Sequence, residues 1–315
     1  MTTWKPISLD GIQSYPLKER ASKVKVDDFG QPWRSGGRMK QWIQSLPNIL
    51  AGDDFRKAAD AIAGAVKAEK MVILGMGAHP IKVGLNPVII DLMERRIIHG
   101  LALNGAGIIH DAELAMVGQT SEDVALQLGN GKFGMAEETG RLLNEAIIEG
   151  GRNGNGLGRS VGDMLIREKF PYNHYSLLAK AVELNIPVTV HVAVGTDIIH
   201  MHPKADGAAI GRTSHLDFRI FANLISGLEG GVYINLGSAV ILPEVFLKAV
   251  TLVRNLGYPL KRFTTLNMDF IKGYRPMTNV VHRPTLEGGK GFSLTGHHEI
   301  MFPLLAAAVI EEMEK

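Results

Sequence analysis

The stretch MVILGMGAHPIKVGLNPVIIDLMERRIIHGLALNG, residues 71–105, carries the clearest fold signal in the chain. A short apolar run at 71–75 ends in glycine, a helical segment follows over 77–96, and a second apolar run over 98–105 again ends at a glycine. Parallel strands need a long crossover connection, so short strands separated by helices of ten or more residues are typical of a parallel sheet. The stretch therefore predicts one strand–helix–strand unit.

The same alternation continues toward the C-terminus. Further strands are expected over 186–195, 230–239 and 261–267, with helices between them, a glycine-rich loop at 288–291 and a last helix over 299–313. This pattern predicts an α/β fold with a doubly wound, mostly parallel Rossmann-like sheet and helices on both faces. Residues 1–50 are expected to form an N-terminal arm and a first helix. Residues 51–315 are expected to form a single NAD-binding-type α/β domain.

Composition limits the function classes. The chain has 315 residues, 45% of them hydrophobic, which is enough for a large core. A formal net charge of +2 gives no sign of a nucleic-acid or membrane partner. The absence of cysteine removes disulfides and thiolate chemistry. No signal-peptide core and no apolar run of 18 residues is present, so a soluble cytoplasmic protein is expected.

Four predicted strand ends are followed by turns of small residues, which is where doubly wound sheets bind ligands. Glycine lets the backbone approach a phosphate, and free amides at the next helix start favour anions. Any one of these turns is explained by a tight connection, but four together indicate a dinucleotide pocket, although Pro80 interrupts the G-x-G-x-x-G pattern. The predicted cofactor-binding residues at these ends are Gly75, Gly77, Ala78, His79, Asn104, Gly105, Ala106, Gly107, Asp197, Gly237, Ser238 and Ala239.

Histidine is the most available titrating side chain, since the chain has eleven histidines and no cysteine. His110, His200 and His282 are candidate acid–base groups. Lys290 lies in a Gly-Gly-Lys-Gly sequence and is a candidate phosphate contact or nucleophile, with a solvated loop lysine as the alternative. Imidazoles and carboxylates also suit zinc or iron, but no HExxH pattern fixes a metal geometry. The residues available for a metal are His200, His202, His297, His298 and Glu299, together with His110 and Asp111.

From about residue 71 to the C-terminus, the chain resembles the deoxyhypusine synthase family. Six segments carry the resemblance in the family's order: VILGMGAHPIKVGLNPVI (72–89), LALNGAGIIHDAEL (101–114), ELNIPVTVHVAVGTDIIHM (183–201), YINLGSAVILPEVFLKAV (233–250), FTTLNMDFIKGYRP (263–276) and TGHHEIMFPLLAAAVIEEM (295–313). Members of this family use NAD to move the aminobutyl group of spermidine, through an enzyme-lysine imine, to a lysine of a translation factor. The resemblance implies a Rossmann-like NAD-binding fold, a homotetramer with active sites at a dimer interface, and an arm that can cover a neighbouring site.

The resemblance also assigns residues. It implies cofactor contacts at Asn267, Met268, Asp269, His297, His298 and Glu299. The family's catalytic histidine corresponds to Pro243 or Glu244, and its imine-lysine motif to His282, Arg283 and Pro284. Its polyamine-binding acids correspond to Ile109, His110, His200, Met277 and Thr278. Each ammonium needs a counter-charge once water is excluded, so the replacements favour an acidic or neutral small-molecule substrate over spermidine.

The leading hypothesis is an NAD-dependent transferase or redox-assisted enzyme of the deoxyhypusine synthase-like type, acting on a small molecule other than spermidine. Its candidate catalytic residues are His110, His200, His282 and Lys290. The alternatives are a genuine deoxyhypusine synthase with Lys290, or else Lys272, as imine lysine, a histidine-ligated metal enzyme on the same fold, and a nucleotide-sensing protein without turnover. The leading hypothesis requires residues 104–107, 237–239 and 297–299 to surround one hollow.

Overall fold

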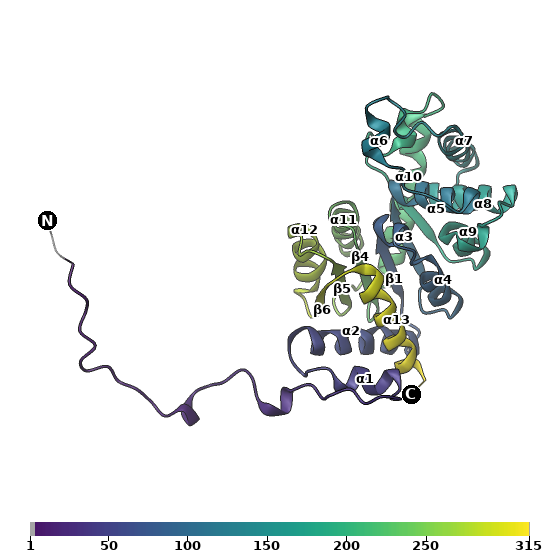
Figure 1. Cartoon of the computed structure of the whole chain (residues 1–315). Coiled ribbons are helices and arrows are strands. Elements are labelled where there is room, and N and C mark those ends of the chain that lie inside the picture. The colour runs from purple at the N-terminus through teal and green to yellow at the C-terminus, as the bar shows by residue number, and fades with distance from the viewer. Residues whose placement is uncertain (1–3, 315) are drawn as a thin grey trace.

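The computed structural model describes residues 4–314, so residues 1–3 of the expected arm lie outside the described residues. Its centre is one six-stranded sheet with the order β3-β2-β1-β4-β5-β6 (Figure 1). Every neighbouring pair is parallel. The strands are β1 (Val72–Met76), β2 (Gly100–Asn104), β3 (Val188–His191), β4 (Val232–Leu236), β5 (Thr264–Asp269) and β6 (Lys290–Thr295). This is the strand order of the Rossmann fold, and the predicted fold class is confirmed.

Helices connect the strands and cover the sheet (Figure 1). Before β4 they are α1 (Met39–Ser45), α2 (Leu50–Lys67), α3 (His79–Lys82), α4 (Asn86–Glu94), α5 (Gly105–Val117), α6 (Val124–Leu128), α7 (Glu137–Asn153), α8 (Leu157–Glu168), α9 (Leu177–Glu183) and α10 (Gly207–Ser226). After β4 they are α11 (Ile241–Asn255), α12 (Tyr274–Pro276) and α13 (His298–Met313). Short 3-10 or π turns are η1 (Leu17–Glu19), η2 (Val26–Asp28), η3 (Asn173–Tyr175), η4 (Ile198–Met201), η5 (Met277–His282) and η6 (Arg283–Thr285).

The two faces of the sheet carry separate apolar cores, because alternate residues of a strand point to opposite faces. In β1, Val72, Leu74 and Met76 belong to the core formed with α2, α5, α8 and α13. Ile73 belongs to the other core, formed with α10 and α11. All five residues of β1 are buried, which explains why the strand reads as a continuous apolar run rather than an alternating one.

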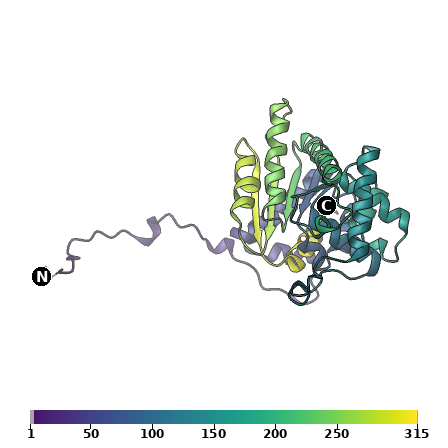
Figure 2. The ribbon, with the colours of Figure 1, turned by 90° about the horizontal axis from the view of Figure 1, so that it is seen from above.

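The N-terminal segment from residue 4 to about residue 36 runs away from this body, as Figures 1 and 2 both show. It contains only the short turns η1 and η2, and no residue in either turn is buried. Large apolar side chains along it, including Trp4, Ile7 and Leu17, are exposed. Within residues 4–314, no helix is both long and apolar enough to cross a membrane.

One strand differs from the sequence-based expectation. Residues 288–291 were expected to form a loop, but Lys290 and Gly291 begin β6, which pairs with β5 from Thr264↔Lys290 to Asp269↔Thr295. The glycines themselves are needed for packing. A Cβ on Gly291 would lie 2.1 Å from the Val281 carbonyl oxygen. Glycine here marks a close backbone approach within a strand, which the sequence pattern does not distinguish from a loop.

The buried carboxylate of Asp217 connects α10 to α8 and β3 by hydrogen bonds. Asp217 accepts hydrogen bonds from the Gly158 amide at the start of α8 (2.9 Å) and from the Val190 amide in β3 (2.8 Å). Burial raises the pKa of Asp217 to about 7. The folded state therefore binds a proton that the unfolded chain has released, so this carboxyl contributes stability at low pH that is lost as pH rises from about 4 through about 7.

Replacing Asp217 with asparagine should remove this pH dependence, because the amide oxygen can still accept both hydrogen bonds but no proton is exchanged. Urea unfolding at a series of pH values measures this effect. Relative to Asp217→Asn, the free energy of unfolding of the wild type should fall by about 4 kcal/mol between pH 4 and pH 8. Parallel pH profiles for the two proteins would contradict this assignment.

Candidate functional site at the carboxyl ends of the strands

The sheet has its switch point between β1 and β4, where the strand order reverses direction. In open α/β sheets, ligands bind in the crevice that forms there, outside the carboxyl ends of the strands. In this chain that edge carries the β1–α3 turn, the β4–α11 turn and the start of α13. Strands neighbour one another at about 4.8 Å, so the ends of β2 and β4, separated by β1, lie about 10 Å apart.

The turns after β1 and β4 touch through two glycines. The Gly77 amide donates to the Leu236 carbonyl (3.1 Å), and a Cβ on Gly77 would lie 2.4 Å from the Gly237 carbonyl oxygen. Gly237 has a φ of +64°, and a Cβ there would lie 2.7 Å from Cε1 of His298. Both positions therefore need glycine, one for a close backbone approach and the other also for its left-handed conformation.

His298 closes this crevice from the α13 side. Its side chain is 1% exposed, and neither ring nitrogen has a hydrogen-bond partner within residues 4–314. Nε2 lies 3.6 Å from Oδ1 of Asp269, and the ring lies 5.3 Å from that of His79. Burial lowers the pKa of His298, with Asp269 opposing this effect. Buried polar atoms without partners are rare, so the ring keeps a donor and an acceptor available at this crevice.

The turn after β4 also presents free amides. The Ser238 hydroxyl accepts from the Leu242 amide (3.1 Å), which caps the start of α11. The amides of Ala239, Val240 and Ile241 have no acceptor among the described residues. Ala239 and Val240 are exposed. Unpaired amides at the start of a 15-residue helix favour a negatively charged group such as a phosphate.

A second group of candidates lies at the ends of β2 and β3. Asn104 caps α5 by accepting from the Gly107 amide (3.0 Å). The carboxylate of Asp197 lies against Gly105, since a Cβ there would be 2.0 Å from Asp197 Oδ2. Burial raises the pKa of Asp197 above its usual value, and the nearby His200 only partly opposes this effect. This places a largely buried carboxylate beside the start of α5.

The ring of His200 is oriented by backbone amides. Its Nδ1 accepts from the Gly195 amide (3.1 Å) and the Asp197 amide (3.3 Å). Nδ1 is thus the acceptor, so the neutral ring carries its proton on Nε2. That Nε2 is buried and has no partner within residues 4–314. His200 is therefore a pre-oriented donor at the carboxyl edge.

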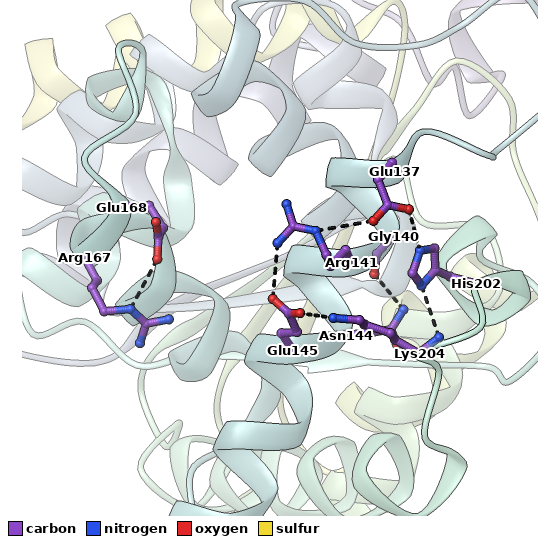
Figure 3. Close-up of polar contacts among 9 residues, drawn as sticks. All are labelled: Glu137, Gly140, Arg141, Asn144, Glu145, Arg167, Glu168, His202 and Lys204. Atoms are coloured by element: carbon purple, nitrogen blue, oxygen red, sulfur yellow. Dashed lines mark hydrogen bonds and ion pairs between the residues drawn. The ribbon is translucent and has the colours of Figure 1, made fainter.

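Side chains of α7 form polar contacts with the loop that carries Asp197 and His200 (Figure 3). The buried Asn144 side chain donates to the Ile199 carbonyl (2.9 Å). His202 lies 3.2 Å from the carboxylate of Glu137 and accepts the Lys204 amide through Nδ1. These contacts hold the β3–α10 loop in place from outside the sheet.

A cavity of about 390 Å³ opens at the same edge, between α10 and the start of α11. Its walls are mainly apolar, with His191, Ser214, His215 and Glu244 as the polar residues. Burial lowers the pKa of His191 to about 3, so this imidazole is neutral at physiological pH. Glu244 accepts from Asn279 (2.9 Å) and pairs with Lys248, whose contact lowers the pKa of Glu244. The cavity is of a size that suits a small molecule.

Three residues predicted to contact a cofactor lie inside strands instead. Gly75 is buried in β1, where a Cβ would lie 2.3 Å from the Tyr233 hydroxyl. Asn267 is buried in β5 and accepts from Asn235 (2.8 Å), and Met268 belongs to the core. The physical reason is position within the strand, because these residues precede the edge and are covered on both faces.

Three predicted catalytic residues lie on three different elements. Lys290 begins β6 at the amino edge, and the five residue steps to Thr295 span about 16 Å. His282 is the last residue of η5. It follows Tyr274 by eight residues, which corresponds to a rise of about 12 Å along a helix. His110 lies on α5 and bonds Thr120 (2.7 Å), with burial lowering its pKa to about 4. Lys272, by contrast, lies in the loop directly after β5 at the carboxyl edge.

The remaining predicted residues do share this edge. They are Gly77, Ala78, His79, Asn104, Gly105, Ala106, Gly107, Asp197, His200, Gly237, Ser238, Ala239, Asp269, His297, His298 and Glu299. Among residues 4–314, no three His, Asp or Glu side chains come together as a metal site would require, so the proposed metal ligands do not form one group. Sequence reasoning missed the cavity, His191 and His215, because the cavity depends on how α10, α11 and the end of β3 pack together in the fold.

No protein-family model and no curated protein matches the sequence. Solved structures do share the fold. A putative deoxyhypusine synthase from Entamoeba histolytica aligns over 90% of this chain and 96% of its own, with 14% identity and a TM-score of 0.50. AgrE, in a ternary complex with ornithine and NAD+, aligns over 82% of this chain with 14% identity and a TM-score of 0.50. ArgZ, a cyanobacterial arginine dihydrolase, aligns over 82% with 15% identity and a TM-score of 0.50.

These similarities concern the fold. The chain spans about a third of ArgZ and AgrE, 31% and 32% of their lengths. It spans nearly the whole putative deoxyhypusine synthase. The neighbours therefore confirm the expected deoxyhypusine synthase-like α/β fold.

Proposed function

We propose that this chain binds a nicotinamide dinucleotide across the carboxyl ends of β1 and β4 and uses it in a redox-assisted conversion of a small molecule other than spermidine. The contact between the Gly77 and Gly237 turns, beside the free amides at the start of α11, carries the proposal. The NAD+ bound to AgrE, whose fold is similar, supports the choice of cofactor. When bound, the nicotinamide supplies a hydride acceptor.

The residues of the edge divide into roles under this proposal. The amides of Ala239, Val240 and Ile241 bind the pyrophosphate. His200 donates a hydrogen bond from Nε2 to the substrate, because backbone amides already occupy Nδ1. The cavity between α10 and α11 excludes water from the apolar part of the substrate.

The geometry argues against the alternative in which Lys290 forms an imine within the same subunit. Lys290 begins β6, so it lies at the edge opposite His200 and Gly237. Lys272 is the lysine of the two that shares their edge. Incubation with NAD and spermidine followed by borohydride is expected to leave Lys290 unmodified. An adduct on Lys290, located by mass spectrometry, would favour a genuine deoxyhypusine synthase.

Calorimetric titration with NAD tests the proposed cofactor. We expect saturable binding with one site per chain and a dissociation constant below about 1 mM, within the range usual for small-molecule ligands. The proposal fails if millimolar NAD gives no heat and no protection against thermal unfolding.

The same titration should discriminate NAD from NADP. β2 ends in Asn104 rather than in an acid, and the Asp197 carboxylate lies beside Gly105 at that point. A carboxylate there can accept from ribose hydroxyls but repels a 2′-phosphate. We expect NADP to bind at least about tenfold more weakly than NAD, and Asp197→Asn to reduce this ratio. Equal affinities in the wild type would contradict the role of Asp197.

A further inference from the structure

A second cavity, of about 950 Å³, lies at the opposite edge of the sheet from the proposed dinucleotide site. It opens between α2 and the starts of β5 and β6, which lie close together in Figure 1. The Gly-Gly-Lys-Gly sequence at 288–291 forms one wall. The carboxyl-edge site does not use this motif, so its role is separate from the proposed function.

One face of α2 forms the facing wall. Lys57, Asp60, Ala61, Gly64 and Ala65 line the cavity and share the helix face by their spacing of three and four residues. A Cβ on Gly64 would meet no atom within 4 Å among the described residues. Glycine in a helix interior costs about 1 kcal/mol relative to alanine, and no packing contact explains it here. The wall is therefore open where a bound molecule would lie.

Positive charge predominates in the lining. Lys290 Nζ has no ion-pair or hydrogen-bond partner within residues 4–314. The Arg262 side chain is 84% exposed and reaches only Glu229, at 3.5 Å. That carboxylate already accepts the Arg262 backbone amide (2.9 Å). Lys57 is held by Asp53 outside the cavity lining. Lys290 and Arg262 therefore have donors to spare.

Asp60 is the one acidic side chain among the cavity-lining residues. Its carboxylate has no hydrogen-bond or ion-pair partner among the described residues. Asp60 and Lys57 both line the cavity from α2. A cationic ligand would meet Lys57, Arg262 and Lys290 against this one carboxylate. The lining thus favours an anion, and Asp60 limits its affinity.

We propose that this cavity binds a phosphate-bearing anion. Lys290 and Arg262 would contact the phosphates, and the anion would lie against α2 at Gly64, where the helix has no side chain. The two side chains come from β6 and from the loop before β5, so they approach the cavity from the side facing α2. Gly288, with a φ of +121°, gives the segment before Lys290 a conformation that other residues rarely adopt. The volume lies within the range of small-ligand sites.

Calorimetric titration with inorganic tripolyphosphate at low ionic strength tests the proposal. We expect saturable binding that Lys290→Gln and Arg262→Gln each weaken by about tenfold, and that Asp60→Asn strengthens by about threefold. Lys169→Gln, which removes an exposed lysine at the end of α8, is the matched control and should leave the affinity unchanged. Thermal unfolding of each variant checks that the fold is retained.

Saturating NAD separates this site from the dinucleotide site. Tripolyphosphate binding should persist with NAD present, and Lys290→Gln should leave NAD affinity unchanged. No saturable tripolyphosphate binding at millimolar concentration would overturn the proposal. So would binding that saturating NAD abolishes completely, or binding that all four variants alter equally, since each outcome places the anion elsewhere.

Discussion

Replacing Ala239 with glutamate is expected to weaken NAD binding by more than about 100-fold, which is about 3 kcal/mol. Ala239 is exposed and follows the Gly237 turn, where its own amide and those of Val240 and Ile241 are unpaired. A carboxylate there would occupy these amides and repel the pyrophosphate. Because the position is exposed, the substitution should leave the melting temperature nearly unchanged.

The matched control is Ala239→Gln, which has the same size without the charge. Glutamine should cost less than about threefold in affinity, so the difference between the two variants reports charge at the helix start. If glutamate and glutamine weaken NAD equally, steric blocking explains the effect. If neither changes the affinity, the dinucleotide does not lie over the start of α11.

Replacing Gly75 with alanine is expected to lower the free energy of unfolding by about 3 kcal/mol, the upper range for overpacking a core. A Cβ at Gly75 would lie 2.3 Å from the Tyr233 hydroxyl. Tyr233 is fully buried and stacked on Phe246, with ring centroids 3.9 Å apart, so it cannot easily move away. Urea denaturation of the variant measures the loss.

Tyr233→Phe supplies the second arm of a double-mutant cycle. The Tyr233 hydroxyl is buried without a hydrogen-bond partner, so its removal alone should be neutral or stabilising by about 1 kcal/mol. In the Tyr233→Phe background, Gly75→Ala should cost less than in the wild type but still destabilise, because the new methyl would still lie 2.9 Å from the ring carbon Cζ. Equal costs in both backgrounds would show that Gly75 is required for a reason other than this contact.

The sequence was sufficient for the α/β fold and for most of the residues at the carboxyl edge. Glycine turns after buried apolar strands have a local signature, so Gly77 and Gly237 could be predicted without coordinates. Gly75 and Met268 lie one residue inside their strands, a difference that proximity to a turn in the sequence does not reveal. The strand–helix alternation predicted the last helix, and the family resemblance pointed to its first residues, which include His298.

The parts that were missed depend on tertiary packing. The α10–α11 cavity forms where two helices pack side by side, and no local sequence pattern predicts that contact. Lys290 was expected in a loop near the site, but glycines there serve close packing against Val281 and begin an edge strand. The replacement of acids by imidazoles is also incomplete, since Asp197 and Asp269 supply carboxylates at the carboxyl edge.

A crystal structure grown with NAD would show where the cofactor binds. We expect pyrophosphate density within hydrogen-bond distance of the amides of Ala239, Val240 and Ile241, above the contact between Gly77 and Gly237. Dinucleotide density at any other edge of the sheet, or clear density for residues 237–241 with no cofactor at saturating NAD, would contradict it.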